Sequence, residues 1–383
     1  MMNAERLCSI FIKYSDVITL PIRVDKGCGV YGQLSSRWEK YLQMLASIDD
    51  LSACIPYAKQ SIDYLTKAID AYYESEHMVA LKHIIETINL LNSNPCGCHL
   101  ISNLGAFYID DEMKQWFRAR VTDAHPLSVE NIKHVPANYR KLINNERYSI
   151  NGIPCLYIGN SILVCWEELN RPSIDSLWVS RYKPKKDLTL INLSTTGFEL
   201  INAMKYLKYV NGSEAAFNQA IIEYFSNWIL QSACSVVVGE EPRVFKEEYV
   251  IPQLVMQSIR NYKADGVMYF STRMEGGFTD EVSWISKNIA IPASDVKGYG
   301  AEPQPYSPKI DSLFNISNPI NVGMYANHLI PSGPRVFHES DNWARSHAPV
   351  FITRAGCPYN RTLFYKCEIE LQHFYNSQRN EIL

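Results

Sequence analysis

The stretch that decides the fold is Glu146–Leu169, with the sequence ERYSINGIPCLYIGNSILVCWEEL. Two strand-like segments, Arg147–Ile150 and Ile153–Ile158, flank Asn151-Gly152. Asn-Gly supplies the two positive-φ residues that a tight type I′ turn requires. The pattern therefore predicts a β-hairpin at this place in the chain.

A short apolar helix is predicted directly after the hairpin, over Ile162–Leu169. Ser161 is suited to cap its first turn, and Asn170-Arg171-Pro172 ends it. The helix is apolar over most of its circumference, so we expect it to be buried on several sides. The acids near its end, Glu167 and Glu168, then need partners or a chemical role.

Three side chains of this unit carry chemistry: Arg147 opens the first strand, Tyr157 lies near the end of the second, and Glu167 or Glu168 lies near the helix end. A surface arginine, a strand tyrosine and a solvated acid are common in any hairpin–helix unit. Judged by residue type alone, an ordinary structural role for these side chains is favoured over a catalytic one.

In order and spacing, the stretch resembles the core of the RES domain family, which is named for its Arg, Glu and Ser residues. The shared features are an Arg-initiated hairpin, a turn like Gly152-Ile153-Pro154, a Leu-Tyr pair and a short helix that ends in an acid. The step from Arg147 to Tyr157 is ten positions, and the step from Tyr157 to Glu168 is eleven. This spacing selects Glu168 over Glu167 as the family's acid.

Two further segments extend the resemblance. The family's Ser follows an Asp-Gly turn and a short strand, and Asp265-Gly266 followed by Ser271 matches that pattern. An Arg-containing strand precedes the core, and Trp116–Arg120 fits that place. Arg118 and Arg120 alternate along this strand, so they share one face of it.

The resemblance implies a fold like that of the ADP-ribosyltransferases and an activity that consumes NAD⁺. Cleavage of the nicotinamide–ribose bond passes through an oxocarbenium-like state, which a carboxylate stabilises. Arginine matches the pyrophosphate with paired donors, and an aromatic ring suits the nicotinamide or ribose. The implied catalytic residues are Glu168, Tyr157 and Arg147, and the implied NAD⁺-binding residues are Arg118, Arg120, Arg147, Tyr157 and Ser271.

Three functions stay open at this point. The first is a bacterial toxin-like enzyme that cleaves NAD⁺ with water or phosphate as acceptor. The second is an ADP-ribosyltransferase that modifies a macromolecule, and the third is a non-catalytic RES-fold binding module. The expected partners are NAD⁺, an antitoxin protein and a second copy of the chain, held through the helical N-terminal part.

Composition bounds these functions. The chain has 383 residues, 46% of them hydrophobic and 20% charged, as in globular proteins. A net charge of −3 gives no reason to expect nucleic-acid binding, and no apolar run reaches the length of a membrane span. Ten scattered cysteines and no secretory signal favour reduced thiols in a cytoplasm.

The Cys96-Gly-Cys98-His99 cluster lacks a second half-site, so no metal is predicted. The chain also lacks a G-x-G-x-x-G fingerprint, which argues against a hydride-transferring dinucleotide enzyme.

The predicted fold class is α+β, with a helical N-terminal bundle followed by an ADP-ribosyltransferase-like mixed sheet with helices. We predict a helical domain over residues 1–105, a RES-like catalytic domain over 106–295 and a C-terminal extension or subdomain over 296–383. Helices are predicted within 37–93, 213–237 and 247–261. Strands are predicted at 116–120, 188–193, 266–272, 285–291, 349–353 and 362–371.

Overall fold

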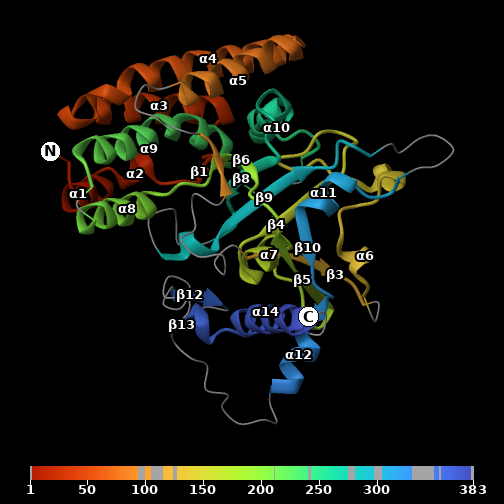
Figure 1. The fold of residues 1–383 in the computed structure, drawn as a ribbon. Helices are drawn as coiled ribbons and strands as arrows, with labels where there is room; N and C mark the ends of the chain where they lie inside the picture. The colour runs from red at the N-terminus through yellow and green to blue at the C-terminus, as the bar shows by residue number, and fades with distance from the viewer. Residues whose placement is uncertain are drawn as a thin grey trace.

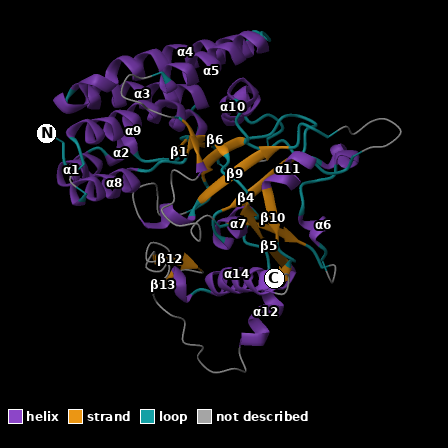
Figure 2. Ribbon diagram, viewed as in Figure 1, coloured by secondary structure: helices purple, strands orange, loops and turns teal. Residues whose placement is uncertain are grey.

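A computed structural model describes residues 2–93, 100–104, 115–123, 127–210, 212–239, 243–274, 281–296, 304–329, 349–352 and 355–380. The motif at Cys96–His99 lies outside the described residues. Figure 1 shows the N-terminal helices, in red and orange, at one end of the molecule and the C-terminal helix, in blue, at the other. The sheet lies between them, as Figure 2 shows in orange.

Among the described residues, nine strands form one mixed sheet in the order β10-β5-β3-β4-β9-β8-β6-β2, with β11 also paired to β5. Within this sheet the β6–β8 pair is parallel, and the other pairs are antiparallel. The predicted α+β class is therefore confirmed. The strands are β2 (Ile101–Asn103), β3 (Trp116–Val121), β4 (Cys155–Gly159), β5 (Leu177–Pro184), β6 (Thr189–Leu193), β8 (Gly266–Phe270), β9 (Lys287–Pro292), β10 (Phe314–Ile316) and β11 (Ile320–Asn321).

Helices cover both ends of this sheet. The predicted helices within 37–93, 213–237 and 247–261 are confirmed, with boundaries shifted by a few residues. The α-helices are α1 (Ala4–Lys13), α2 (Ser15–Ile18), α3 (Val30–Ala46), α4 (Ile55–Tyr73), α5 (His77–Asn92), α6 (Val129–Ile132), α7 (Ile162–Glu168), α8 (Gly197–Tyr209), α9 (Glu214–Cys234), α10 (Val250–Ser258), α11 (Pro308–Leu313), α12 (Val322–Leu329) and α14 (Leu363–Asn380).

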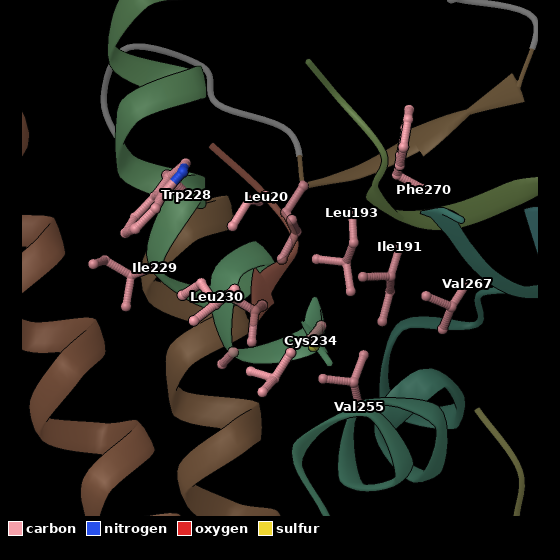
Figure 3. Packing of buried hydrophobic residues seen from close by; sticks show 14 of the residues in the cluster. Leu20, Ile191, Leu193, Trp228, Ile229, Leu230, Cys234, Val255, Val267 and Phe270 are labelled. Carbon is pink, nitrogen blue, oxygen red and sulfur yellow. The ribbon is translucent and has the colours of Figure 1, made fainter. Parts of the chain in front are cut away.

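The N-terminal helices pack directly on α9. The Trp38 indole nitrogen donates a hydrogen bond to Ser232 Oγ at 2.9 Å, and the rings of Tyr41 and Trp228 stack at 4.0 Å between centroids. One hydrophobic cluster runs from Met2 to the C-terminal helix and includes α9 and one face of the sheet. In Figure 3, side chains from α9, β6 and β8 gather in this cluster. The three-part division at residues 105 and 295 stays a prediction.

The two faces of the sheet bury different clusters. Phe117, Val179, Val267 and Ala290 belong to the larger cluster, whereas the alternate residues of the same strands belong to a smaller one. The strand members of the smaller cluster are Trp116, Leu156, Ile158, Tyr182, Leu190, Met268, Ile289, Ile291 and Phe314. Because strand side chains alternate between faces, each strand residue can be assigned to one side of the sheet.

Two local predictions are wrong in detail. The turn at Asn151-Gly152 is present, and Ile153 N–H donates to Ile150 C=O at 2.9 Å, but only Gly152 has positive φ (+74°). That pattern fits a type II turn, which splays its flanking segments, so the ladder is the single bridge between Ile150 and Ile153.

The predicted strand at 362–371 is instead part of α14. Its aromatic and β-branched residues favour a strand. Phe364, Cys367, Glu368 and Leu371 are nevertheless buried at helical spacing, so packing decides for the helix. The strand at 349–353 is confirmed as β12, Pro349–Ile352, which pairs with β13, Ala355–Pro358.

Candidate active site

Helix α7 presents Glu168, and it packs closely against β4 because the last residue of that strand is glycine. A Cβ atom on Gly159 would lie 2.4 Å from Val164 Cγ1 and 2.9 Å from Cys165 Sγ. Ser161 caps the helix as predicted, since its Oγ accepts a hydrogen bond from Val164 N–H at 3.0 Å. Ser161 Oγ also donates to Ile285 C=O at 2.5 Å, which ties the helix start to the segment before β9.

Glu168 is held by three side chains from other parts of the chain. Its Oε1 accepts hydrogen bonds from Ser271 Oγ and from Asn288 Nδ2, each at 2.8 Å. Arg273 Nε lies 3.3 Å from the other oxygen, Oε2. Glu167 points elsewhere and pairs with Arg171 at 2.7 Å. The structure thus places Glu168, and not Glu167, beside Ser271.

Burial raises the pKa of Glu168 above its ordinary value, and this is the largest influence on it. The hydrogen bond from Ser271 opposes the rise, followed by the charges of Arg273 and Arg147 and the hydrogen bond from Asn288. The side chain still keeps 34% of its surface exposed. Glu168 is therefore a carboxyl group surrounded by donors and open on one side.

The surrounding strand residues share one face of the sheet. Asn288 lies between Gly159 on β4 and Tyr269 on β8 in the strand register, and Tyr157 opposes Ala290 in the next row. Ser271 follows β8 on the same side as Tyr269, because it lies two positions further along the chain. The structure thus places Tyr157 on the face of the sheet from which Asn288 and Ser271 reach Glu168, and the roles of these residues stay a prediction.

Tyr157 contributes an aromatic ring to this face. It is half-buried, and its hydroxyl oxygen is buried beside the thiol of Cys155. Burial raises the pKa of Tyr157 well above its ordinary value, so the phenol stays protonated. The neighbouring Tyr269 packs against Tyr148 with ring centroids 4.3 Å apart, which adds a second aromatic group to the same surface.

Arg147 lies at the edge of this group and is held by backbone carbonyls. Its guanidinium donates to Val236 C=O at 2.8 Å and to Cys234 C=O at 3.2 Å, at the end of α9. It also lies over the ring of Tyr249, 5.0 Å from the centroid. Its positive charge lowers the pKa of Glu168, so the two groups interact electrostatically.

Arg118 and Arg120 are not brought to Glu168. They alternate with Phe117 and Ala119, so they lie on the side of the sheet that carries the smaller cluster. Arg118 donates to Ile132 C=O at 2.7 Å and to Tyr157 C=O at 2.8 Å. Arg120 donates to Lys133 C=O at 2.9 Å. In this structure both arginines tie the loop after α6 to the sheet.

Two partners of Glu168, Asn288 and Arg273, were not found by sequence reasoning. Arg273 follows Ser271 by two residues, and its side chain is 46% exposed. Its backbone N–H donates to Ser271 Oγ at 3.2 Å, and its guanidinium bonds Asn170 Oδ1. Its closeness to Ser271 in the sequence was the one available signal. Asn288 had none, because only the β4–β9 pairing places it.

In the part of the chain that the structure describes, no group of three or more His, Cys, Asp or Glu side chains is arranged to hold a metal ion. Among the described helices, none combines the length and apolar composition needed to cross a bilayer.

Comparisons with known proteins find a relative that is named as a putative toxin. No family model matches it. A protein of Bacillus subtilis (strain 168) named "Putative toxin YopC" is 27% identical over 326 residues, covering 82% of this chain and 70% of that protein. Among solved structures, the M. tuberculosis MbcT–MbcA toxin–antitoxin complex matches with 12% identity and a TM-score of 0.27, over 56% of this chain and 87% of that one. Membership of the RES family stays a prediction.

Proposed function

We propose that the chain is a toxin-like enzyme that consumes NAD⁺ by cleaving its nicotinamide–ribose bond. The observation that carries the proposal is the setting of Glu168. Its carboxyl group is bonded by Ser271 and Asn288, lies beside Arg273, and is open on one side. The family resemblance and the 27% identity to a protein named as a toxin support the same function.

The proposed reaction needs little proton transfer in its first step. Nicotinamide leaves with the electron pair of the C–N bond, and positive charge develops on the ribose. The ionised Glu168 carboxylate stabilises that charge, because an anion fixed in a poorly solvated site needs no reorganisation. Water or phosphate then bonds to the ribose carbon and loses a proton.

The other residues of the group have supporting roles in this proposal. Ser271 and Asn288 fix the carboxylate through Oε1, which leaves Oε2 toward Arg273. The rings of Tyr157 and Tyr269 offer flat surfaces for the nicotinamide or ribose. Arg147 and Arg273 supply positive charge near the site for the pyrophosphate.

The test is to follow NAD⁺ with purified protein, with and without phosphate, and to identify every product. Free nicotinamide with ADP-ribose is expected from a hydrolase, and a phosphorylated ADP-ribose from a phosphorylase. A second arm uses labelled NAD⁺ in lysate. Label on a macromolecule without free ADP-ribose would mean that a macromolecule, and not water or phosphate, accepts the ADP-ribose. No reaction in either arm would contradict the proposal.

A further inference from the structure

We infer that Glu368, on the C-terminal helix α14, is a positioning residue for the carboxylate of Glu168. The inference rests on the proposed function and assigns a role to residues 355–380, which the family resemblance does not cover. Its basis is a single hydrogen bond. Glu368 Oε1 accepts from the backbone N–H of Ile162, the first residue of α7, at 2.7 Å.

This contact adds a second cap to the first turn of α7. The first N–H groups of a helix have no partner within it and must find one elsewhere. Ser161 satisfies the N–H of Val164, and Glu368 satisfies that of Ile162. Both caps are fully or almost fully buried, since Ser161 is 0% exposed and Glu368 is 2% exposed. Water therefore cannot replace Glu368.

Glu368 is itself held in place. Tyr359 donates its hydroxyl to the same Oε1 at 2.6 Å. The helices are also joined by a ring contact between Trp166 and Phe364, whose centroids lie 5.3 Å apart. In Figure 1, α14 lies next to α7 and far from the N-terminal helices. The carboxylate of Glu368 therefore links α14 to the first residue of α7 and is held in place by Tyr359.

Because α7 is short, the contact of Glu368 with Ile162 affects the position of Glu168. The helix has seven residues, and Glu168 is its last. At 1.5 Å of rise per residue, Ile162 and Glu168 are about 9 Å apart along the axis. A helix this short moves as one unit, so a shift at Ile162 moves Glu168 away from Ser271 and Asn288. Misplacing a reacting group by about 1 Å costs roughly a hundredfold in rate.

The test compares Glu368→Leu, Glu368→Gln and Glu370→Leu. Leucine removes the acceptor, whereas glutamine keeps an oxygen for Ile162 and Tyr359. Glu370 lies on the same helix but bonds Tyr325 on α12, so its variant is a matched control. We expect kcat for NAD⁺ to fall about 10- to 100-fold in Glu368→Leu with little change in KM, and to stay within about threefold in the other two.

Hydrogen exchange of the intact protein supplies a readout that does not depend on activity. Amides of residues 160–168 should exchange faster in Glu368→Leu than in Glu370→Leu. Unchanged exchange there would overturn the inference. Where the wild-type protein consumes NAD⁺, a wild-type kcat in Glu368→Leu would overturn it as well. If the wild-type protein consumes no NAD⁺, the proposed function fails. The exchange rates still test whether Glu368 holds the start of α7.

A milder variant covers the case in which Glu368→Leu does not fold. Tyr359→Phe removes one donor from Oε1 and leaves Glu368 in place. A smaller loss of kcat with faster exchange in α7 would support the inference, and wild-type values of both would overturn it.

Discussion

Ser271 donates a hydrogen bond of 2.8 Å to Glu168 Oε1, although 103 positions separate the two residues in the sequence. One residue follows strand β8 and the other ends helix α7, and only the folded sheet brings them together. The bond acts on the charge of Glu168, because it opposes the rise in pKa that burial causes. Four predictions follow from this pair and its surroundings.

Replacing Glu168 by glutamine should abolish NAD⁺ consumption and leave the protein folded. Glutamine keeps the size and one acceptor oxygen but cannot stabilise a developing positive charge. Glu167→Gln is the matched control, since Glu167 is adjacent on the same helix and bonds Arg171 instead. Rates of nicotinamide release measure the effect, and turnover retained by Glu168→Gln would count against the proposed mechanism.

The pH dependence of kcat/KM should report on Glu168. Because burial raises its pKa, activity should fall on the acid side at a pH above the ordinary glutamate value of 4.5. Ser271→Ala removes the strongest influence that lowers this pKa, so the acid limb should move to higher pH. Asn288→Ala should move it less, since its hydrogen bond has the smaller effect. If the acid limb of the kcat/KM profile stays at the same pH in Ser271→Ala, a group other than Glu168 causes it.

The contribution of Glu168 to stability should fall as pH rises, whereas activity should rise. A glutamate whose pKa is raised on folding binds more protons folded than unfolded between the two pKa values, so its contribution to stability falls as pH rises. Glu168→Gln should therefore raise Tm at pH 7, and the gain should vanish below about pH 4.5, where the acid is protonated in both states. Thermal unfolding of both proteins across this range checks the sign.

Arg118 and Arg273 should differ in what their loss affects. Arg118 donates to two backbone carbonyls. Arg118→Leu should lower the free energy of unfolding by about 2 kcal/mol with little change in KM for NAD⁺. Arg273→Leu should raise KM roughly tenfold with little effect on unfolding, because its partly exposed guanidinium lies beside Glu168. Urea unfolding and initial rates separate the two, and a large rise in KM for Arg118→Leu would favour the role that the resemblance implied.

Local signals allowed part of this structure to be predicted. Gly152 and Ser161 act within a few residues of themselves, so the turn and the start of α7 were visible in the sequence. The turn type was wrong because Asn151 does not take the positive φ that a type I′ turn requires, and only Gly152 does. The spacing from Arg147 to Glu168 selected Glu168 over Glu167 through resemblance and not through physics, and the structure places that acid beside Ser271.

The remaining features depend on distant contacts. Glu368 lies 206 positions from Ile162, and Asn288 lies 120 positions from Glu168. No periodicity or capping signal spans such distances. The order of segments in the resemblance predicted that Arg118 binds NAD⁺. In the structure its guanidinium donates instead to the carbonyls of Ile132 and Tyr157. Side-chain type identified candidates, and only tertiary pairing decided which of them meet.

The packing of the N-terminal helices on α9 has a consequence for synthesis of the protein. Ile22 pairs with Val236, and Trp38 bonds Ser232, so these segments reach their partners only after α9 has left the ribosome. At 5–20 residues per second, the delay after α5 is on the order of ten seconds. During that interval the buried faces of α3 and α4 are open to water and to other chains. Apolar surface exposed in this way is prone to associate with other chains until α9 covers it.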